Sequence, residues 1–207
     1  LTTFKLALPM GLAFAGEHLL GLVDTVVAGH LGATELAATG LGNALFMAAL
    51  IIGVGTISGI EPMTAQARGR DETDFVSRVL RSRNLMSLCL SPIIILLSEC
   101  FLNIYFAVAD LDPLLEQRMS EYLLARYLCV PFVLHSSVSR NLLQAYEDPK
   151  AVFTSMIYVN LINLPLNLYL ATDVSFSAFG LSLSGQNLGV VGLGIGTSIV
   201  CTFRAFY

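Results

Sequence analysis

The sequence reads EHLLGLVDTVVAGHLG at residues 17–32, where two carboxylates lie within a segment that is otherwise apolar enough to cross a lipid bilayer. An ionised carboxylate near the centre of a membrane helix costs about 2.5–3.5 kcal/mol on insertion scales, and such groups mostly face a cavity or an ion pathway. Glu17 and Asp24 are seven residues apart, close to two helical turns, so both lie on one helix face with Gly21 between them. This stretch therefore predicts a membrane helix that binds or moves an ion.

The composition of the whole chain also indicates a membrane protein. Of the 207 residues, 55% are hydrophobic and 13% are charged, and the mean hydropathy is +0.73. Soluble domains carry about 25% charged residues, so a soluble fold is not expected. The basic and aromatic residues do not form a pattern that suits nucleic acid, and the four cysteines lack metal-ligand spacing. We therefore expect a lipid bilayer as the surroundings, no nucleic-acid partner and no cofactor.

Apolar segments long enough to span a bilayer recur six times, which predicts an all-α, polytopic transmembrane bundle in a single lobe over residues 1–207. The predicted spans are residues 4–29, 36–60, 84–108, 122–146, 151–171 and 188–203. Residues 61–83 are expected to form a polar loop, and a Ser/Gly-rich loop is expected to follow the fifth span up to Gly185. The span at 122–146 is the least hydrophobic and carries Arg126, His135 and Arg140, so we expect it inside the bundle.

The basic residues predict the orientation of these spans. Six crossings place both termini on one side, and nine of the eleven Lys and Arg residues fall on that side. Basic residues collect in cytoplasmic loops. We therefore expect a multi-pass protein of the inner (cytoplasmic) membrane with its N-terminus and its C-terminus in the cytoplasm.

Short motifs spread along the chain resemble those of one transporter family, the multidrug and toxic compound extrusion (MATE) proteins. They occur in the family's order, and they are Val23-Asp24-Thr25 with Ala28-Gly29 and Leu31-Gly32, LAATGLG at 36–42, GIEPMTAQARG at 59–69, Tyr122-Leu123, NLPLN at 163–167, and Gly189-Val190-Val191-Gly192 with Gly196-Thr197. Together they cover essentially the whole chain. The resemblance is to the NorM-like branch of the family.

Family members have twelve helices in two related six-helix lobes, and this chain resembles the N-terminal lobe. The resemblance therefore implies that the chain is a fragment whose missing C-terminal lobe is its partner within the same protein. In the family, the aspartate matching Asp24 takes a proton or a sodium ion, and residues matching Asn163, Asn167 and Thr197 help to form that site. The resemblance thus implies a cation-coupling site at these four residues.

The residue types suit that role. Asn163 and Asn167 are four residues apart and so share one helix face, where each supplies a carbonyl oxygen, while Thr197 supplies a hydroxyl. Such a set suits either a Na⁺ ion or a polar pocket around an aspartate that takes up a proton. Some branches of the family carry an aspartate where this chain has Asn167, and losing that carboxylate favours the proton. Glu17, where an amide or apolar residue is expected, is a candidate second titrating group.

The resulting expectation is an antiporter, not an enzyme, that uses H⁺ or Na⁺ to export organic, often cationic, drugs or toxic metabolites. A related flippase for lipid-linked oligosaccharides is an alternative, although it needs a larger basic cavity than Arg126 and Arg140 provide. A membrane enzyme acting on lipid would need an Asp/His constellation near the interface, which the sequence does not show. A non-transporting membrane assembly subunit is the remaining alternative.

Overall fold

The computed structural model describes residues 2–146, 149–173, 176–178, 181–183 and 185–206. Within these ranges the chain forms eight helices and one two-stranded antiparallel hairpin. The elements are α1 (Thr2–Leu31), α2 (Ala33–Ser58), α3 (Ile60–Gly69), α4 (Thr73–Val108), α5 (Pro113–Tyr127), α6 (Val130–Ala145), α7 (Pro149–Ala171), β1 (Phe176–Ala178), β2 (Leu181–Leu183) and α8 (Gly189–Phe206).

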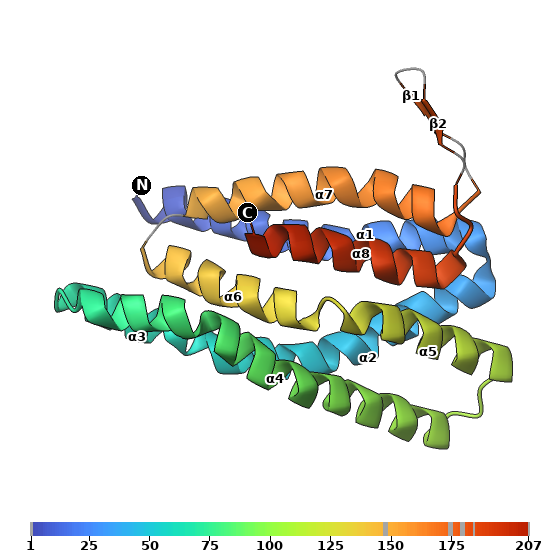
Figure 1. Cartoon of the computed structure of the whole chain (residues 1–207), viewed down its shortest axis with the longest axis horizontal. Helices are drawn as coiled ribbons and strands as arrows, with labels where there is room; N and C mark the ends of the chain where they lie inside the picture. Colours follow the sequence, from blue (N-terminus) through green and yellow to red (C-terminus); the bar gives the residue numbers. More distant parts are fainter. Residues whose placement is uncertain (1, 147–148, 174–175, 179–180, 184, 207) are drawn as a thin grey trace.

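The eight helices make six passes along the bundle, as predicted, because α3 continues from α2 and α6 continues from α5 (Figure 1). The break between α5 and α6 lies at Leu128 and Cys129, just before Pro131, which has no backbone N–H to donate. Among the described residues, three helical segments are long and apolar enough to cross a membrane, namely Ala33–Gly69, Asp74–Val108 and Lys150–Ala171. His18–Leu31 and Gly189–Ala205 are shorter apolar helices.

The connections differ from those expected. Residues 61–83 do not form a polar loop, because α3 and the first turns of α4 occupy most of this stretch. Its arginines and alanines are good helix formers, so the helices continue beyond the apolar segments. The expected loop after α7 contains the β1–β2 hairpin, in which Phe176 pairs with Leu183 and Ala178 pairs with Leu181.

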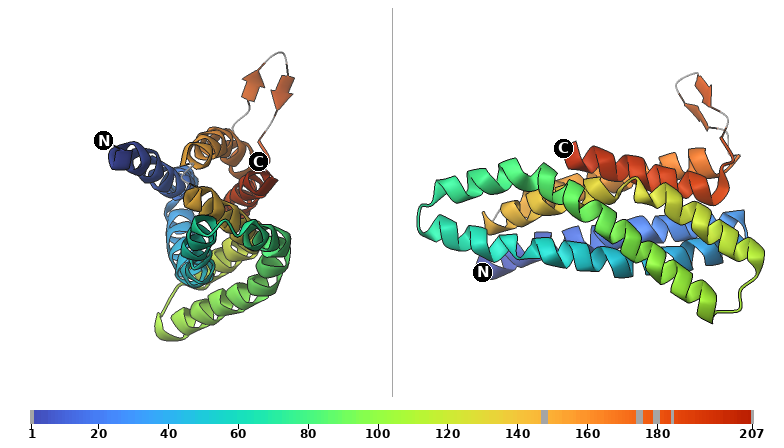
Figure 2. Two further views of the ribbon diagram at one scale, coloured as in Figure 1. Left: turned by 90° about the vertical axis from the view of Figure 1, so that its left-hand side faces the viewer. Right: turned by 60° about the horizontal axis from the view of Figure 1, so that its bottom comes forward.

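The helices form two groups that pack against each other. One group consists of α1, α7 and α8, and the other consists of α2, α4, α5 and α6, with α5 packed on α8 and α1 packed on α2. Figure 2 shows the two groups end-on and α4 running obliquely across its neighbours. The N and C marks lie toward the same end of the bundle as the turn between α3 and α4 (Figure 1), as an even number of passes requires.

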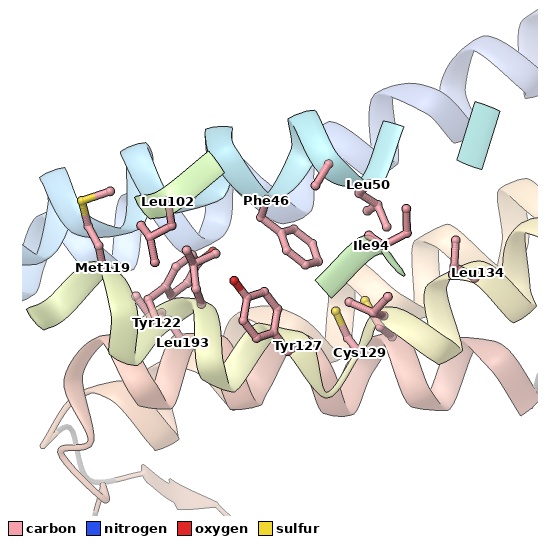
Figure 3. Close-up of a cluster of buried hydrophobic side chains, with 14 of the residues drawn as sticks. Phe46, Leu50, Ile94, Leu102, Met119, Tyr122, Tyr127, Cys129, Leu134 and Leu193 are labelled. Atoms are coloured by element: carbon pink, nitrogen blue, oxygen red, sulfur yellow. The ribbon is translucent and has the colours of Figure 1, made fainter. Parts of the chain in front are cut away.

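The main apolar core lies within the second group and on the face of α8 that meets it. Figure 3 shows its large side chains, including Phe46 of α2, Ile94 of α4, Tyr122 of α5, Leu134 of α6 and Leu193 of α8. All five are at most 2% exposed. The prediction that the span at 122–146 lies inside the bundle is confirmed by this packing.

Candidate functional site

Asp24 lies in the middle of the bundle with its carboxylate enclosed by hydrogen-bond donors from three other helices. The residue is 1% exposed. Asn167 of α7 donates from Nδ2 to Oδ1 at 2.6 Å, and Thr197 Oγ1 of α8 lies 3.0 Å from Oδ1 and 2.9 Å from Oδ2. Arg126 of α5 donates from a terminal guanidinium nitrogen to Oδ2 at 3.2 Å. The carboxylate is therefore stabilised by one buried ion pair and two neutral donors.

The other predicted site residues lie at different distances from this carboxylate. Asn163 is linked to the carboxylate through Asn167, which donates from Nδ2 to Asn163 Oδ1 at 3.3 Å. Two buried amide atoms of the pair, Asn163 Nδ2 and Asn167 Oδ1, have no hydrogen-bond partner. Glu17 lies in α1, but its side chain is outside the described residues. The structure thus brings Asp24, Asn167 and Thr197 into direct contact and places Asn163 next to them.

Arg126 is the residue of this site that the sequence analysis did not place. Its guanidinium carbon lies 4.7 Å from the centre of the Phe46 ring and 5.7 Å from that of Tyr122, and a terminal nitrogen donates to the Tyr122 hydroxyl at 3.1 Å. Its Nε is buried without a partner. Charge balance could have indicated that Arg126 pairs with Asp24, because an arginine and an aspartate in two apolar spans both need a partner inside the membrane.

Glycines of α8 allow the helices that carry these groups to approach closely. A Cβ atom on Gly192 would lie 2.6 Å from the Leu170 carbonyl oxygen of α7, and one on Gly194 would lie 2.6 Å from Ala125 Cβ of α5. A Cβ atom on Gly196 would overlap Asn167 Oδ1. Small residues permit such backbone approach between membrane helices. Because these glycines have no side chain, α8 can pack closely against α7 on one side and against α5 on the other.

A cavity of about 490 Å³ borders the Asp24 site. Arg126 and Thr197, which both contact Asp24, also line this cavity. Its other walls come from α1, α2, α6 and α8 and are mostly apolar, with Phe46, Leu50 and Val133 among the lining residues. A compound in this cavity would therefore lie next to the ion pair.

The arrangement around Asp24 is suited to binding and releasing a proton. The three side chains that contact the carboxylate, those of Arg126, Asn167 and Thr197, each present a donor to it, whereas Na⁺ requires several oxygen atoms turned toward it. Protonation would remove the charge of Asp24 and leave the buried guanidinium of Arg126 without its counter-ion. Because α1 and α5 belong to the two different helix groups, a proton on Asp24 weakens a link between them.

The sequence of this chain is similar to that of known proteins. Residues 9–169 match the family model described as MatE. The chain is 28% identical over 195 residues to the multidrug resistance protein MdtK of Yersinia pestis (strain Pestoides F) and equally to MdtK of Klebsiella pneumoniae (strain 342). In both cases the alignment covers 94% of this chain and 41% of the relative, so the chain spans about two fifths of the length of these relatives.

Solved MATE structures share the fold. A MATE protein crystallised with MaL6 superposes with a TM-score of 0.79 at 19% identity, covering 98% of this chain and 42% of that protein. The Vibrio cholerae MATE transporter VcmN in its bent form superposes with a TM-score of 0.74 at 18% identity, covering 97% and 43%. At these identities the likeness concerns the fold, and in each case it extends over less than half of the other protein.

Proposed function

Because the chain belongs to the MatE family, whose members are membrane transporters and not enzymes, we propose that it forms one lobe of a cation-coupled antiporter that exports small organic compounds. The observation that carries this proposal is the buried carboxylate of Asp24, which contacts α5, α7 and α8 at the same time. A group in that position can convert the binding of one small ion into a change in helix packing. The relatives' name, multidrug resistance protein, supports drugs as the exported compounds.

The proposed mechanism starts with the uptake of a proton by Asp24. The neutral carboxyl no longer attracts Arg126, and α1 shifts against α5 while Asn167 and Thr197 rearrange their hydrogen bonds. The proton biases the lobe toward one conformation only as far as it binds that conformation more tightly. Export follows if the compound and the proton favour opposite conformations.

The proton is the coupling ion that this geometry favours over Na⁺. A sodium ion next to Oδ2 of Asp24 would lie beside the guanidinium of Arg126, which is 3.2 Å from that oxygen. Like charges at such a distance repel strongly where water is excluded. Binding of Na⁺ by Asp24, Asn163, Asn167 and Thr197 would therefore require Arg126 to leave the carboxylate first.

We place the lobe in the inner membrane with both termini in the cytoplasm and with a second, C-terminal lobe as its partner. Large apolar side chains lie exposed along the outer faces of the helices, among them Leu85, Leu96 and Leu124 at 66%, 69% and 70%. Such faces suit contact with lipid or with another lobe. The nine basic residues near one end of the bundle support the orientation.

The two remaining alternatives, an assembly subunit and a lipid-linked oligosaccharide flippase, would require different features in this site. An assembly subunit without transport activity would not need a buried carboxylate paired with an arginine, because such a pair adds little stability in a membrane protein over an apolar contact. A flippase for lipid-linked oligosaccharides would need the cavity to accept the acidic group of a lipid. The match to the MatE model and to the MdtK proteins favours drug export.

The test is efflux of a fluorescent organic compound from cells that express the complete open reading frame encoding this chain. Transport is measured under an imposed pH gradient and then under an imposed sodium gradient, with the natural protein and with Asp24→Asn. We expect efflux driven by the pH gradient that Asp24→Asn abolishes at unchanged expression. Efflux that survives this substitution would contradict a coupling role for Asp24.

A matched control is Asp112→Asn, because Asp112 is an exposed aspartate that caps α5 outside the site. This variant should retain its gradient-driven efflux. Loss of transport in both variants would indicate a general loss of folding and would contradict a specific role for Asp24.

A further inference from the structure

Asparagines of α7 bind α1 at two levels. Asn160, Asn163 and Asn167 are three and four residues apart, so they follow one another along one face of α7. Asn167 donates to Asp24 Oδ1 at 2.6 Å, and Asn160 donates from Nδ2 to the carbonyl oxygen of Gly16 at 3.0 Å. Polar contacts therefore join α1 to α7 at two levels, which lie about 12 Å apart along α1.

The contact at Gly16 brings the two helices close together. A Cβ atom on Gly16 would lie 3.2 Å from Met156 Cβ, which is tighter than an ordinary van der Waals contact. Asn160 Nδ2 also donates to the carbonyl oxygen of Met156 in its own helix at 2.9 Å, so both of its N–H groups are used. Its Oδ1 is buried without a hydrogen-bond partner, a cost that a leucine in the same place would avoid. Packing alone therefore does not account for an amide at this position.

The two contacts respond differently to a proton. At Asp24 the acceptor is a carboxylate, whose charge disappears when it is protonated. At Gly16 an amide meets a backbone carbonyl oxygen, and neither group titrates. A proton therefore loosens the Asp24 contact and leaves the Gly16 contact in place. Ionisable residues around the two contacts are Arg126 of α5, Arg140 of α6, Arg204 of α8, which donates to Met156 Sδ at 4.0 Å, and His18 and Glu17 of α1, the last with its side chain outside the described residues.

We propose that Asn160 is a positioning residue for transport, which anchors α1 to α7 at Gly16 and thereby confines the movement caused by a proton on Asp24 to the part of α1 that follows Gly16. This inference rests on the proposed function and adds a residue to its coupling step. Between the two contacts, Leu20 packs against apolar side chains of α7 and α8. Apolar contact has no preferred direction, so it lets α1 tilt while Gly16 stays in place. Without the anchor, α1 would move as a whole, and the proton would not produce a defined displacement.

The experiment measures two distances between α1 and α7 by electron paramagnetic resonance, in the purified complete gene product at one fixed pH. Exposed native cysteines are replaced by serine, and pairs of nitroxide labels are attached to introduced cysteines. The label pair at Val26 and Leu164 reports on the Asp24 contact, and the pair at Ala15 and Leu161 reports on the Gly16 contact. All four labelled positions are exposed in this lobe. Asp24→Asn represents the uncharged carboxyl group, so the pH stays fixed throughout.

We expect Asp24→Asn to lengthen the distance at the Asp24 contact and to leave the distance at the Gly16 contact unchanged. Adding Asn160→Leu to this variant should lengthen the distance at the Gly16 contact as well. A neutral hydrogen bond contributes enough to change an equilibrium by up to roughly tenfold, so the fraction of molecules with the long distance should rise by up to that factor. Asn160→Leu alone should leave both distances short, because the bonds of Asp24 still hold α1.

A second variant and a matched control keep the test decisive. Asn160→Leu leaves no buried donor unpaired, and the Gly16 carbonyl oxygen keeps its helical hydrogen bond within α1. Gly16→Ala weakens the same contact from the other side, because the added methyl group pushes α1 away from α7, and it should have the same effect when it is added to Asp24→Asn. The matched control is Asn103→Leu, because Asn103 of α4 donates to the Glu99 carbonyl oxygen within its own helix at 2.8 Å. This control should leave both distances unchanged.

Efflux supplies a readout that a purely structural role would not change. Asn160→Leu should lower the rate of proton-driven efflux per folded molecule by up to roughly tenfold. The pH of half-maximal efflux should stay the same, because the bonds of Asn160 go to backbone carbonyl oxygens and not to Asp24. A residue that only stabilised the fold would change the amount of folded protein and not the rate per molecule.

Three results would overturn the proposal. They are a distance at the Gly16 contact that lengthens in Asp24→Asn itself, a distance at the Gly16 contact that stays short in both double variants, and an unchanged rate of efflux in Asn160→Leu. The proposed function is tested separately by efflux in Asp24→Asn. Efflux that persists in Asp24→Asn, with both distances as expected, would contradict the coupling role of Asp24 and leave the anchor at Gly16 in place.

Discussion

The two helix groups of this lobe are held together in different ways. In the group of α2, α4, α5 and α6, large apolar side chains such as Phe46, Ile94 and Leu134 interlock in one continuous core. Between α1, α7 and α8, among the side chains whose burial the structure describes, Leu20, Val159 and Val200 form a small buried apolar cluster with Leu166 packed against it. There, glycine contacts and polar bonds such as Asn160 Nδ2 to the Gly16 carbonyl oxygen at 3.0 Å provide much of the packing.

Because of this difference, we expect the two helix groups to differ in how easily they rearrange. The group with the large core resists rearrangement, because interlocked side chains have few alternative arrangements. The group of α1, α7 and α8 is joined in part by polar contacts, and in the proposed mechanism a proton on Asp24 alters these contacts. The ion pair between Asp24 and Arg126 lies where the two groups meet, so a charge change there acts on the contact between a firm part and an adaptable part.

The largest effect should come from breaking the ion pair on one side. Arg126→Met leaves the carboxylate of Asp24 buried without a counter-ion, which typically costs about 3–5 kcal/mol. The free energy of unfolding in detergent, measured by titration with sodium dodecyl sulfate, should fall by about that amount. Adding Asp24→Asn to this variant should restore much of it, because no unpaired charge then remains. A double variant as unstable as the single one would contradict the pairing.

A comparable loss of stability without loss of coupling is expected in the apolar core. Leu134 is fully buried, packs near Gly53 and Ile94, and does not line the cavity beside Asp24. Leu134→Ala should lower the free energy of unfolding by about 3 kcal/mol through the cavity that it leaves. Proton-driven efflux per folded molecule should stay unchanged. A selective loss of coupling would show that the two groups do not differ in the way described.

Gly196→Ala tests the close approach of α8 and α7. The added methyl group would overlap Asn167 Oδ1, so either α8 or the amide must move. We therefore expect the free energy of unfolding to fall by about 2 kcal/mol and proton coupling to weaken. The control is Gly29→Ala in α1, because nothing lies within 4 Å of a Cβ atom at Gly29. Alanine there should stabilise the helix by about 0.5–1 kcal/mol. Thermal unfolding of both variants gives the comparison, and equal destabilisation would contradict it.

Thr197→Val removes one donor from Asp24 and keeps the size of the side chain. The carboxylate retains Arg126 and Asn167, so the expected loss of stability is about 1.5 kcal/mol, as for a hydrogen bond to a charged group. The pH at which efflux is half-maximal should shift in this variant, because Asp24 loses a group that stabilises its charged form. An unchanged pH profile would mean that Thr197 plays no part in the coupling step.

The smallest effect is expected at the exposed end of α5. Hydrogen bonds from Gln117 and Arg118 hold the pKa of Glu121 below its usual range, so folding favours the ionised side chain. Its contribution to stability is therefore present at neutral pH and is lost as the pH falls through the lowered pKa. Glu121→Gln should cost less than about 1 kcal/mol, with no cost at acidic pH. Unfolding measured at two pH values checks the sign, and an equal cost at both would contradict it.

The sequence predicted the number of passes well because hydropathy reports directly on what can lie in lipid. Helix ends were predicted less well, since the arginine-rich residues 73–83 continue α4 although they are polar. The hairpin after α7 was not predicted, because its short strands lie in a Ser/Gly-rich stretch that is typical of a loop.

For the site, periodicity and resemblance together pointed to Asp24, Asn163, Asn167 and Thr197. The pairing of Asp24 with Arg126 was missed, because periodicity tells which residues share a face of one helix but not which faces of two helices meet. Arg126 was expected only to lie inside the bundle with the rest of its span. The guanidinium reaches the carboxylate because α1 and α5 both pack against α2 and α8.

The most direct test of the account is whether the coupling proton resides on Asp24. Infrared difference spectra of the reconstituted complete gene product, recorded as the pH is lowered, report the carbonyl stretch of protonated carboxyl groups. We predict a band from a protected carboxyl group that appears in the natural protein and is absent from Asp24→Asn, while Asp112→Asn retains it. The same band in Asp24→Asn would place the proton on another residue and contradict the account.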